Sequence, residues 1–259
     1  MTNNFEVDIL ASGSKGNSTL IKAGNTAVLI DAGISTKRIV AGLHSCGIEP
    51  EDLSGILITH EHRDHVAGLE VWGKRYPTVP IFANERTWLQ LPCRRVFTSE
   101  QVRVFPRGCV LGNLRIESFK TSHDAVDPVG YKLYYKDDKC TYLTDCGYIT
   151  KECREAAEGS QTLILEANHD EDMLRHGPYP IMLQERILGN LGHLSNTTAG
   201  NLLANLKRRP EEVLLAHLSE QNNSVEVAYN TVQNILAGQK EKIKLALYVA
   251  RQNMLVTNK

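Results

Sequence analysis

The run His60-Glu61-His62-Arg63-Asp64-His65 places three histidines and one aspartate within six residues. It directly follows residues 56–59, whose sequence Ile-Leu-Ile-Thr predicts a short buried strand. Two histidines separated by one residue on an extended backbone can reach the same metal ion, and a turn after them can direct Asp64 and His65 towards a second one. A solvated polar loop explains such a concentration of histidines poorly. The run therefore predicts a metal site.

Four further polar residues each stand where an apolar segment ends. In α/β and two-sheet folds, this edge of the sheet is where sites are built. Taken singly, each would be a turn-forming aspartate or a structural histidine. Together with the cluster at 60–65 they predict one assembled site, and they are Asp31, His123, Asp145 and His217.

The elements that must position these residues follow from hydrophobic periodicity and turn signals. Strands are predicted at 5–11, 18–22, 27–31, 56–59, 79–83, within 101–142 as several strands of period two, and at 163–166, 213–217 and 244–249. Helices are predicted at 36–46, 66–76, 84–91, 170–175, 181–191, 197–207 and 224–237. This order predicts an α/β fold of two packed sheets with helices outside. Since no low-complexity linker divides the chain, residues 1–259 are expected to form one domain.

The composition is that of a globular protein, with 42% hydrophobic and 23% charged residues among 259. A net charge of −1 argues against wrapping nucleic acid over a large surface, although it allows a phosphodiester substrate held by metal ions. The sequence shows no export signal and no apolar run long enough to cross a membrane. Its six cysteines form no CxxC pair. A cytoplasmic protein with reduced thiols and no membrane partner is expected.

The ordered motifs Asp31, His60-x-His62-x-Asp64-His65, His123, Asp145 and His217 resemble the five-motif pattern of the metallo-β-lactamase superfamily over most of the chain. Members of that superfamily are αββα sandwich hydrolases in which two mixed sheets are flanked by helices. Shorter runs are similar to its YycJ/WalJ branch, a cytoplasmic nuclease-like group with 5′-to-3′ DNA exonuclease activity. These runs lie at residues 11–18, 168–170, 192–196 and 216–219.

The resemblance implies two divalent metal ions. His60, His62 and His123 would bind one ion, Asp64, His65 and His217 the other, and Asp145 would bridge them. Five neutral imidazoles and two carboxylates leave a net positive centre, which suits an anionic substrate and a metal-bridging hydroxide as nucleophile. Asp64 would also be catalytic, orienting or deprotonating that nucleophile. Mixed histidine and carboxylate ligands permit zinc, manganese or iron.

Two residues beside the predicted ligands have open roles. Asp31 would orient a ligand histidine by accepting its second N–H, or it would be only a turn acceptor before Gly33. His193 would be catalytic, donating to the substrate phosphate or protonating the leaving oxygen, as a comparable histidine does in related phosphodiesterases. Alternatively, the segment around His193 serves only to begin a helix.

Six residues are predicted to bind the substrate because they lie in segments rich in small hydrogen-bond donors. A hairpin turn is the alternative for the first four and helix capping for the last two. They are Ser12, Ser14, Lys15, Asn17, Ser195 and Asn196. Arginines 86, 94, 95, 103 and 107 form either a phosphate-binding patch or a solvated face. His169 is expected to border the cleft without binding metal, and Cys146 to point away from it.

These features predict a metal-dependent hydrolase that cleaves a phosphodiester, with DNA favoured over RNA as the nucleic-acid partner. A thioester or lactone hydrolase of the glyoxalase-II type would share the same metal ligands. An RNA-processing nuclease would usually carry an inserted binding arm, and no such insertion is evident. A non-catalytic regulatory protein is disfavoured by the complete ligand set. The oligomeric state stays open.

Overall fold

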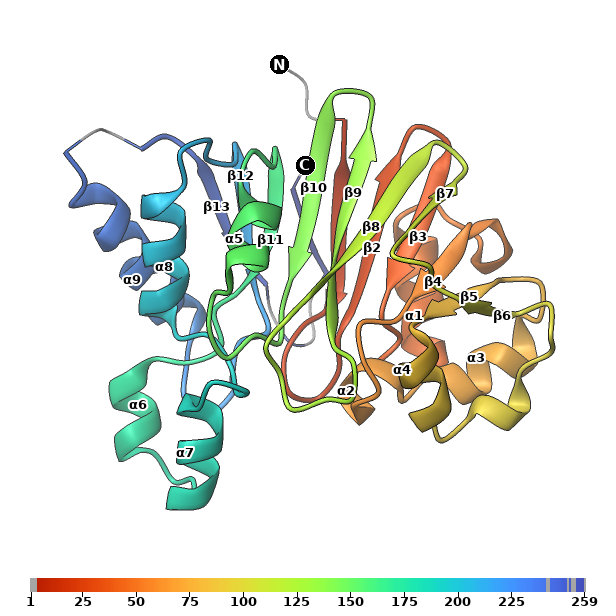
Figure 1. Cartoon of the computed structure of the whole chain (residues 1–259), viewed down its shortest axis with the longest axis horizontal. Coiled ribbons are helices and arrows are strands. Elements are labelled where there is room, and N and C mark those ends of the chain that lie inside the picture. Colours follow the sequence, from red (N-terminus) through yellow and green to blue (C-terminus); the bar gives the residue numbers. More distant parts are fainter. Residues whose placement is uncertain (1–3, 241–242, 251, 253–254, 259) are drawn as a thin grey trace.

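A computed structural model describes residues 4–240, 243–250, 252 and 255–258. Its centre consists of two mixed β-sheets that face each other, with helices on both outer sides (Figure 1). Apolar side chains from both sheets meet in one buried cluster between them, including Ile9 and Val28 from one sheet and Ile116, Tyr131 and Leu214 from the other. The predicted αββα sandwich is confirmed.

The first sheet has the strand order β14-β1-β2-β3-β4-β5-β6. Its first four strands pair antiparallel and the remaining three continue parallel to β3. The strands are β1 (Glu6–Ala11), β2 (Ser18–Ala23), β3 (Thr26–Ile30), β4 (Gly55–Leu57), β5 (Ile81–Ala83), β6 (Val102–Val104) and β14 (Val256–Thr257).

The second sheet repeats this plan with the order β13-β12-β11-β10-β9-β8-β7. Strands β7 to β10 pair antiparallel, and β10 to β13 run parallel. The strands are β7 (Gly108–Leu111), β8 (Leu114–Lys120), β9 (Val129–Tyr135), β10 (Asp138–Leu143), β11 (Thr162–Glu166), β12 (Glu212–Ala216) and β13 (Ala246–Val249). In both sheets, therefore, the parallel strands end at the same edge.

Helices cover the outer face of each sheet, so the central parallel strands are buried on both sides and are largely apolar. Ile39 of α1 (Thr36–Ser45), Trp72 of α3 (Leu69–Arg75) and Trp88 of α4 (Glu85–Gln90) belong to the core outside the first sheet. Outside the second sheet, the core includes Ala156 of α5 (Lys151–Ala157), Leu203 of α8 (Asn196–Asn205), and Val232 of α9 (Val225–Ala237).

Two helical predictions differ from the structure. The helix predicted at 66–76 is divided into α2 (Arg63–Val66) and α3, with Gly68 between them. A Cβ at Gly68 would lie 2.2 Å from the Ile34 carbonyl oxygen, so the break lets the chain dock closely on the loop after β3. Helix α5 was not predicted, although Thr150 caps it by accepting from the Cys153 amide.

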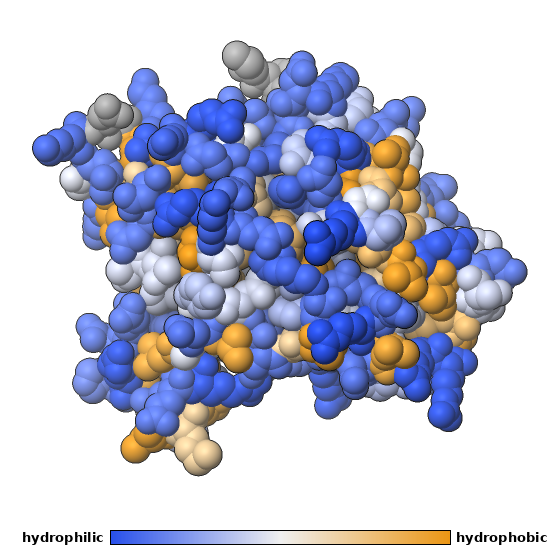
Figure 2. All heavy atoms as spheres, in the orientation of Figure 1, coloured by the Kyte–Doolittle hydropathy of each residue, from blue (hydrophilic) through white to orange (hydrophobic). Residues whose placement is uncertain are grey.

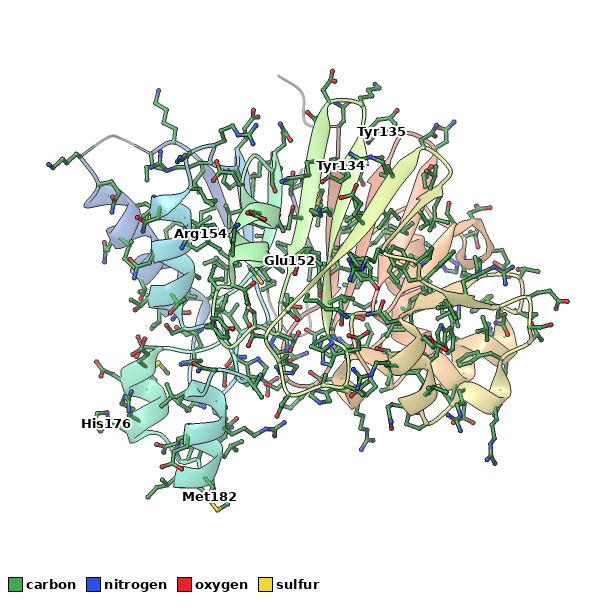
Figure 3. The ribbon with its side chains drawn as sticks, viewed as in Figure 1. Tyr134, Tyr135, Glu152, Arg154, His176 and Met182 are labelled. Atoms are coloured by element: carbon green, nitrogen blue, oxygen red, sulfur yellow. The ribbon has the colours of Figure 1, made fainter. Side chains whose placement is uncertain are left out.

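Helices α6 (Glu171–His176) and α7 (Ile181–Leu188) project beyond the sheets as an arm at the lower left of Figure 1. His176 and Met182 lie on the outer part of this arm, far from the sheets (Figure 3). Ile181 and Met182 are 72% and 83% exposed, and Figure 2 shows hydrophobic side chains at the arm's tip. Both helices were predicted, but their projection as an arm was not.

No helix in the described ranges is long and apolar enough to cross a membrane.

Candidate metal centre

All seven predicted metal ligands lie together at the edge where the parallel strands of both sheets end. Asp31, Asp145 and His217 come directly or almost directly after β3, β10 and β12, and each has a left-handed backbone, with φ of 61°, 54° and 57°. Left-handed conformations are unfavourable for residues with a Cβ and concentrate at functional sites. The backbone thus turns sharply at three positions where a strand delivers a side chain to this edge.

The ligand atoms converge in overlapping groups, two of which match the predicted division between two ions. In the first, which holds His60, His62 and His123, the Nδ1 of His62 lies 3.3 Å from the Nε2 of His123. In the second, Asp64 Oδ2 lies 3.4 Å from the Nε2 of His65 and 3.5 Å from the Nε2 of His217.

Asp145 lies between these groups. One of its oxygens is 3.7 Å from His123 Nε2 and 3.5 Å from His217 Nε2, and the other is 3.4 Å from His65 Nε2. A single carboxylate therefore reaches ligands of both groups, which is the position expected of a bridging residue.

The donor atoms fit divalent metal ions. The Nε2 atoms of His60 and His217 and the Oδ2 atom of Asp145 are buried and have no hydrogen-bond partner among the described residues. Buried polar atoms of this kind are rare in proteins because desolvation without a partner is costly. Imidazole nitrogens and carboxylate oxygens converging within 4.8 Å are the ligands that zinc, manganese and iron accept.

Asp31 orients the histidines on the first-sheet side of the site. Its Oδ2 accepts from His65 Nδ1 at 2.7 Å, while its carboxylate also accepts from the amide and the hydroxyl of Thr59. Because the Thr59 hydroxyl donates to Asp31, its oxygen can accept from His60 Nδ1 at 3.0 Å. Both histidines are thereby oriented with Nε2 directed towards the ligand cluster, so that a metal ion can bind there in place of a proton.

Glu166, at the end of β11, plays the corresponding part on the second-sheet side and was not among the predicted residues. It is fully buried, and its Oε1 accepts from His217 Nδ1 at 2.9 Å and from His193 Nδ1 at 2.7 Å. Its Oε2 accepts from the amides of Cys146 and Leu194. A carboxylate closing the apolar run 163–166 is the same signal that identified Asp145, so the sequence contained the means to find it.

The buried carboxylates and histidines shift one another's pKa values. For Glu166, burial raises the pKa, but His193 and His217 together lower it to about 2. For His217, burial lowers the pKa, whereas Asp145, Asp64 and Glu166 raise it to about 10. The pKa of His65 is also raised, by Asp145, Asp31 and Asp64 against the effect of burial. Burial lowers the pKa of His60 and His123.

A cavity of about 240 Å³ opens onto the ligand cluster. The metal-ligand side of the cavity includes His62, Asp64, His123, Asp145 and His217, and His193 lies beside them. Its other wall comes from the arm and consists of Tyr179, Leu183, Arg186 and Ile187. The Nδ1 of His193 is engaged by Glu166, so its Nε2 is the nitrogen available to the cavity.

The polar residues of the turn between β1 and β2 fall into two sets with different positions. Ser14 lines the cavity, and Lys15 lies in an adjoining groove. Ser12 accepts from the His217 amide at 2.6 Å, and Asn17 Nδ2 lies 3.1 Å from His65 Nε2 and 3.3 Å from Asp64 Oδ2. Ser12 and Asn17 thus support the ligand residues and do not line the cavity.

Ser195 and Asn196 do not line the cavity either. The Ser195 hydroxyl accepts from the Thr198 amide as the N-cap of α8 and donates to Glu171 at 2.9 Å. The Asn196 side chain is buried and hydrogen-bonds with Asn223. These hydrogen bonds hold the start of α8 behind His193. Neither side chain lines the cavity, as the predicted role in substrate binding would require.

Other residues singled out in the sequence lie outside the cluster. His169 is buried beside Ser195, and Cys146 packs into the core with its Sγ 3.9 Å from that of Cys153. Arg94 and Arg103 donate to nearby carbonyls around α4 and β6. None of the five arginines between 86 and 107 lines the cavity or the adjoining groove, which favours a solvated face.

Comparison with known proteins agrees with this fold and site. Residues 26–218 match the family model of the β-lactamase superfamily domain, and the chain belongs to this superfamily. It is 41% identical over 240 residues to the exodeoxyribonuclease WalJ of Streptococcus pneumoniae. The aligned region covers 90% of this chain and 88% of that protein. It is 36% identical to the exodeoxyribonuclease YycJ of Bacillus anthracis, over 88% of both.

Among solved structures, the metallo-β-lactamase fold protein YhfI of Bacillus subtilis superposes with a TM-score of 0.74. The match covers 99% of this chain and 100% of that one at 16% identity, so it supports the fold alone. Together with the buried histidine and aspartate cluster, the superfamily membership identifies a metal-dependent hydrolase.

Proposed function

We propose that this protein is a DNA exonuclease that hydrolyses phosphodiester bonds in the 5′-to-3′ direction with two bound divalent ions. The observation that carries this proposal is the combination of a complete ligand cluster with 41% identity to an exodeoxyribonuclease along 88% of its length. His60, His62 and His123 would hold one ion, Asp64, His65 and His217 the other, and Asp145 both. Zinc, manganese and iron are the candidates for these ions.

Divalent ions bound here would supply Lewis acidity that activates water and neutralises phosphate charge. The chain itself contributes position and proton handling. Asp64 lines the cavity and lies beside both His65 and His217, so its carboxylate can orient the attacking water. Asp31 and Glu166 hold the ligand histidines in the correct tautomer.

His193 is suited to protonate the oxygen that leaves. Its Nδ1 donates to Glu166 at 2.7 Å, and its ring lies 5.0 Å from that of His123 and 5.1 Å from that of His217, measured between centroids. A buried carboxylate at Nδ1 fixes the orientation of the ring and aims Nε2 at the cavity. His193 would thus deliver a proton to the 3′-oxygen while Glu166 fixes its direction.

The direct test is incubation of the purified protein with manganese and DNA carrying a label at the 5′ or at the 3′ end. Release of labelled mononucleotide first from the 5′ end is the expected result. His193→Ala should lower kcat by about 10²-fold to 10⁴-fold, the usual contribution of a general acid, with metal content unchanged. Absence of cleavage by fully metal-loaded protein would contradict the proposal, and turnover of S-lactoylglutathione instead would favour a thioester hydrolase.

A further inference from the structure

A second cavity adjoins the metal centre on the side away from the arm. This basic groove has a volume of about 480 Å³ and shares Ser14 and Asp64 with the first cavity, so the two adjoin at these residues. Its remaining lining comes from the early turn, the loop before α1, α1 itself and α2. Three cationic side chains belong to it: Lys15, Arg38 and Arg63.

The two cavities differ in charge. The first contains three carboxylates, on Asp64, Asp124 and Asp145, the first and last of which are proposed metal ligands, and one arginine, Arg186, whose Nε is already paired with Asp124 at 2.6 Å. The basic groove contains three cations against Asp64 alone. Lys15 also pairs with Glu220, whereas Arg63 is exposed and forms no salt bridge with any described residue. A polyanion extending from the metal centre is therefore attracted into the basic groove and not along the arm.

The start of α1 strengthens this attraction. Ser35 caps the helix at the groove, yet the first turn contains no acidic residue and carries both Lys37 and Arg38. Cations at a helix N-terminus oppose the helix dipole, so this arrangement is locally unfavourable. A bound anion would offset it, because helix dipole and arginine would then act on the same negative charge.

We propose that the basic groove binds the phosphodiester backbone of a single DNA strand beyond the bond that is cleaved. The terminal nucleotide would occupy the cavity under the arm, where Tyr179, Leu183 and Ile187 offer an apolar wall. The following phosphates would lie along Arg38 and Arg63. This assignment rests on the proposed nuclease function for its choice of polyanion.

The test compares two double variants that remove the same charge. Arg38→Ala/Arg63→Ala removes two cationic side chains from the lining of the groove. Arg86→Ala/Arg95→Ala removes two exposed cations that do not line the groove or the first cavity. Binding of a fluorescent 12-nucleotide single strand with phosphorothioate linkages, which slow hydrolysis, is measured on metal-loaded protein by anisotropy. Melting temperatures check that all variants are folded.

The groove variant should bind about tenfold more weakly than wild type, with the slope of log Kd against log salt reduced by about 1.4, since each phosphate contact on a single strand contributes about 0.7. The control variant should stay within about twofold of wild type, because scattered surface charges outside a contact act weakly through screening. Equal weakening of both variants, or of neither, would overturn the groove assignment.

Failure of this inference is distinguishable from failure of the proposed function. If wild type cleaves DNA but the two double variants bind alike, the nuclease proposal stands and the groove assignment falls. If the groove variant alone loses binding but wild-type protein cleaves no DNA, the groove binds a strand and the exonuclease proposal falls.

Discussion

Two buried carboxylates support the two sides of the metal site, and they differ in what else they contact. Asp31 holds His65 directly and His60 through Thr59, and both histidines belong to the metal cluster. Glu166 holds the metal-cluster histidine His217 and also His193, which lines the substrate cavity. On the first-sheet side the carboxylate therefore hydrogen-bonds, among the described residues, only with the histidine and aspartate cluster and Thr59, whereas on the second-sheet side it links a proposed ligand to His193, which lines the cavity.

The two sides also differ in how their residues are distributed along the sequence. On the first-sheet side, four of the ligands come from one six-residue run, so short local geometry brings them together. On the second-sheet side, the residues come from the ends of β8, β10, β11 and β12 and from the loop before α8. A site assembled from separate strands can place one carboxylate between two histidines with different tasks, which a contiguous run cannot do as readily.

The largest expected effect is the difference between mutating Asp31 and mutating Glu166. Asp31→Asn should weaken metal binding by about 10-fold to 100-fold, as loss of a residue that orients a ligand does, and kcat should recover at saturating metal. Glu166→Gln should weaken metal binding similarly but also leave kcat about 10²-fold low at saturating metal, because His193 loses its anionic partner. Metal content and kcat are measured together over a metal titration.

The pH dependence of kcat provides the control for this comparison. If Glu166 acts through His193, the pH profile of kcat should differ from wild type in Glu166→Gln and be unchanged in Asp31→Asn. Full recovery of kcat in Glu166→Gln at high metal would mean that both carboxylates serve only the ligands, and the difference between the two sides would disappear.

A smaller effect concerns protons displaced by the metal. Without metal, the pKa of His217 is raised to about 10 and that of His65 is also raised, so both hold a proton at neutral pH. Since burial lowers the pKa of His60 and His123, these rings are already neutral. Metal binding at pH 7.5 should therefore release about two protons, and the affinity for metal should fall as the pH decreases.

Calorimetry in two buffers with different ionisation enthalpies measures this release. Because the folded pKa of His217 is raised, its protonation stabilises the metal-free fold below about pH 6.5, and this stability is lost as the pH rises towards about 10. The melting temperature of metal-free protein should fall over that interval. Metal binding without proton release would contradict the proposed charge states on both sides of the site.

The sequence predicted the fold and the seven clustered side chains well because both depend on signals that are local. Apolar strands ending in Asp31, Asp145 and His217 can be recognised one by one, and parallel strands bring their ends to one edge. Glu166, which ends the predicted strand 163–166, carried the same signal but was not among the predicted residues. Its importance depends on two histidines reaching it from 27 and 51 residues away.

The substrate side was harder because its geometry depends on tertiary contacts. The projection of α6 and α7, which brings Tyr179 and Arg186 to the cavity, cannot be inferred from their helical periodicity. Small polar residues such as Ser12 and Ser195 are equally suited to bind a ligand or to hold the backbone, and the structure gives both of them hydrogen bonds within the protein. Residue type alone does not separate these two uses.

The smallest expected effect tests whether residues of the second-sheet side other than His193 contact the substrate. Ser195→Ala removes the N-cap of α8 and should lower the free energy of unfolding by about 1 kcal/mol, the usual value for such a cap. Ser224→Ala is the matched control, because Ser224 caps α9 in the same way by accepting from the Val227 amide and does not line the cavity. Chemical denaturation should give a loss for Ser195→Ala at least as large as that for Ser224→Ala, because Ser195 is buried and also donates to Glu171, and KM for DNA should be unchanged in both. A rise in KM for Ser195→Ala alone would show that its hydroxyl contacts the substrate, extending the substrate-facing part of this side from His193 to the start of α8.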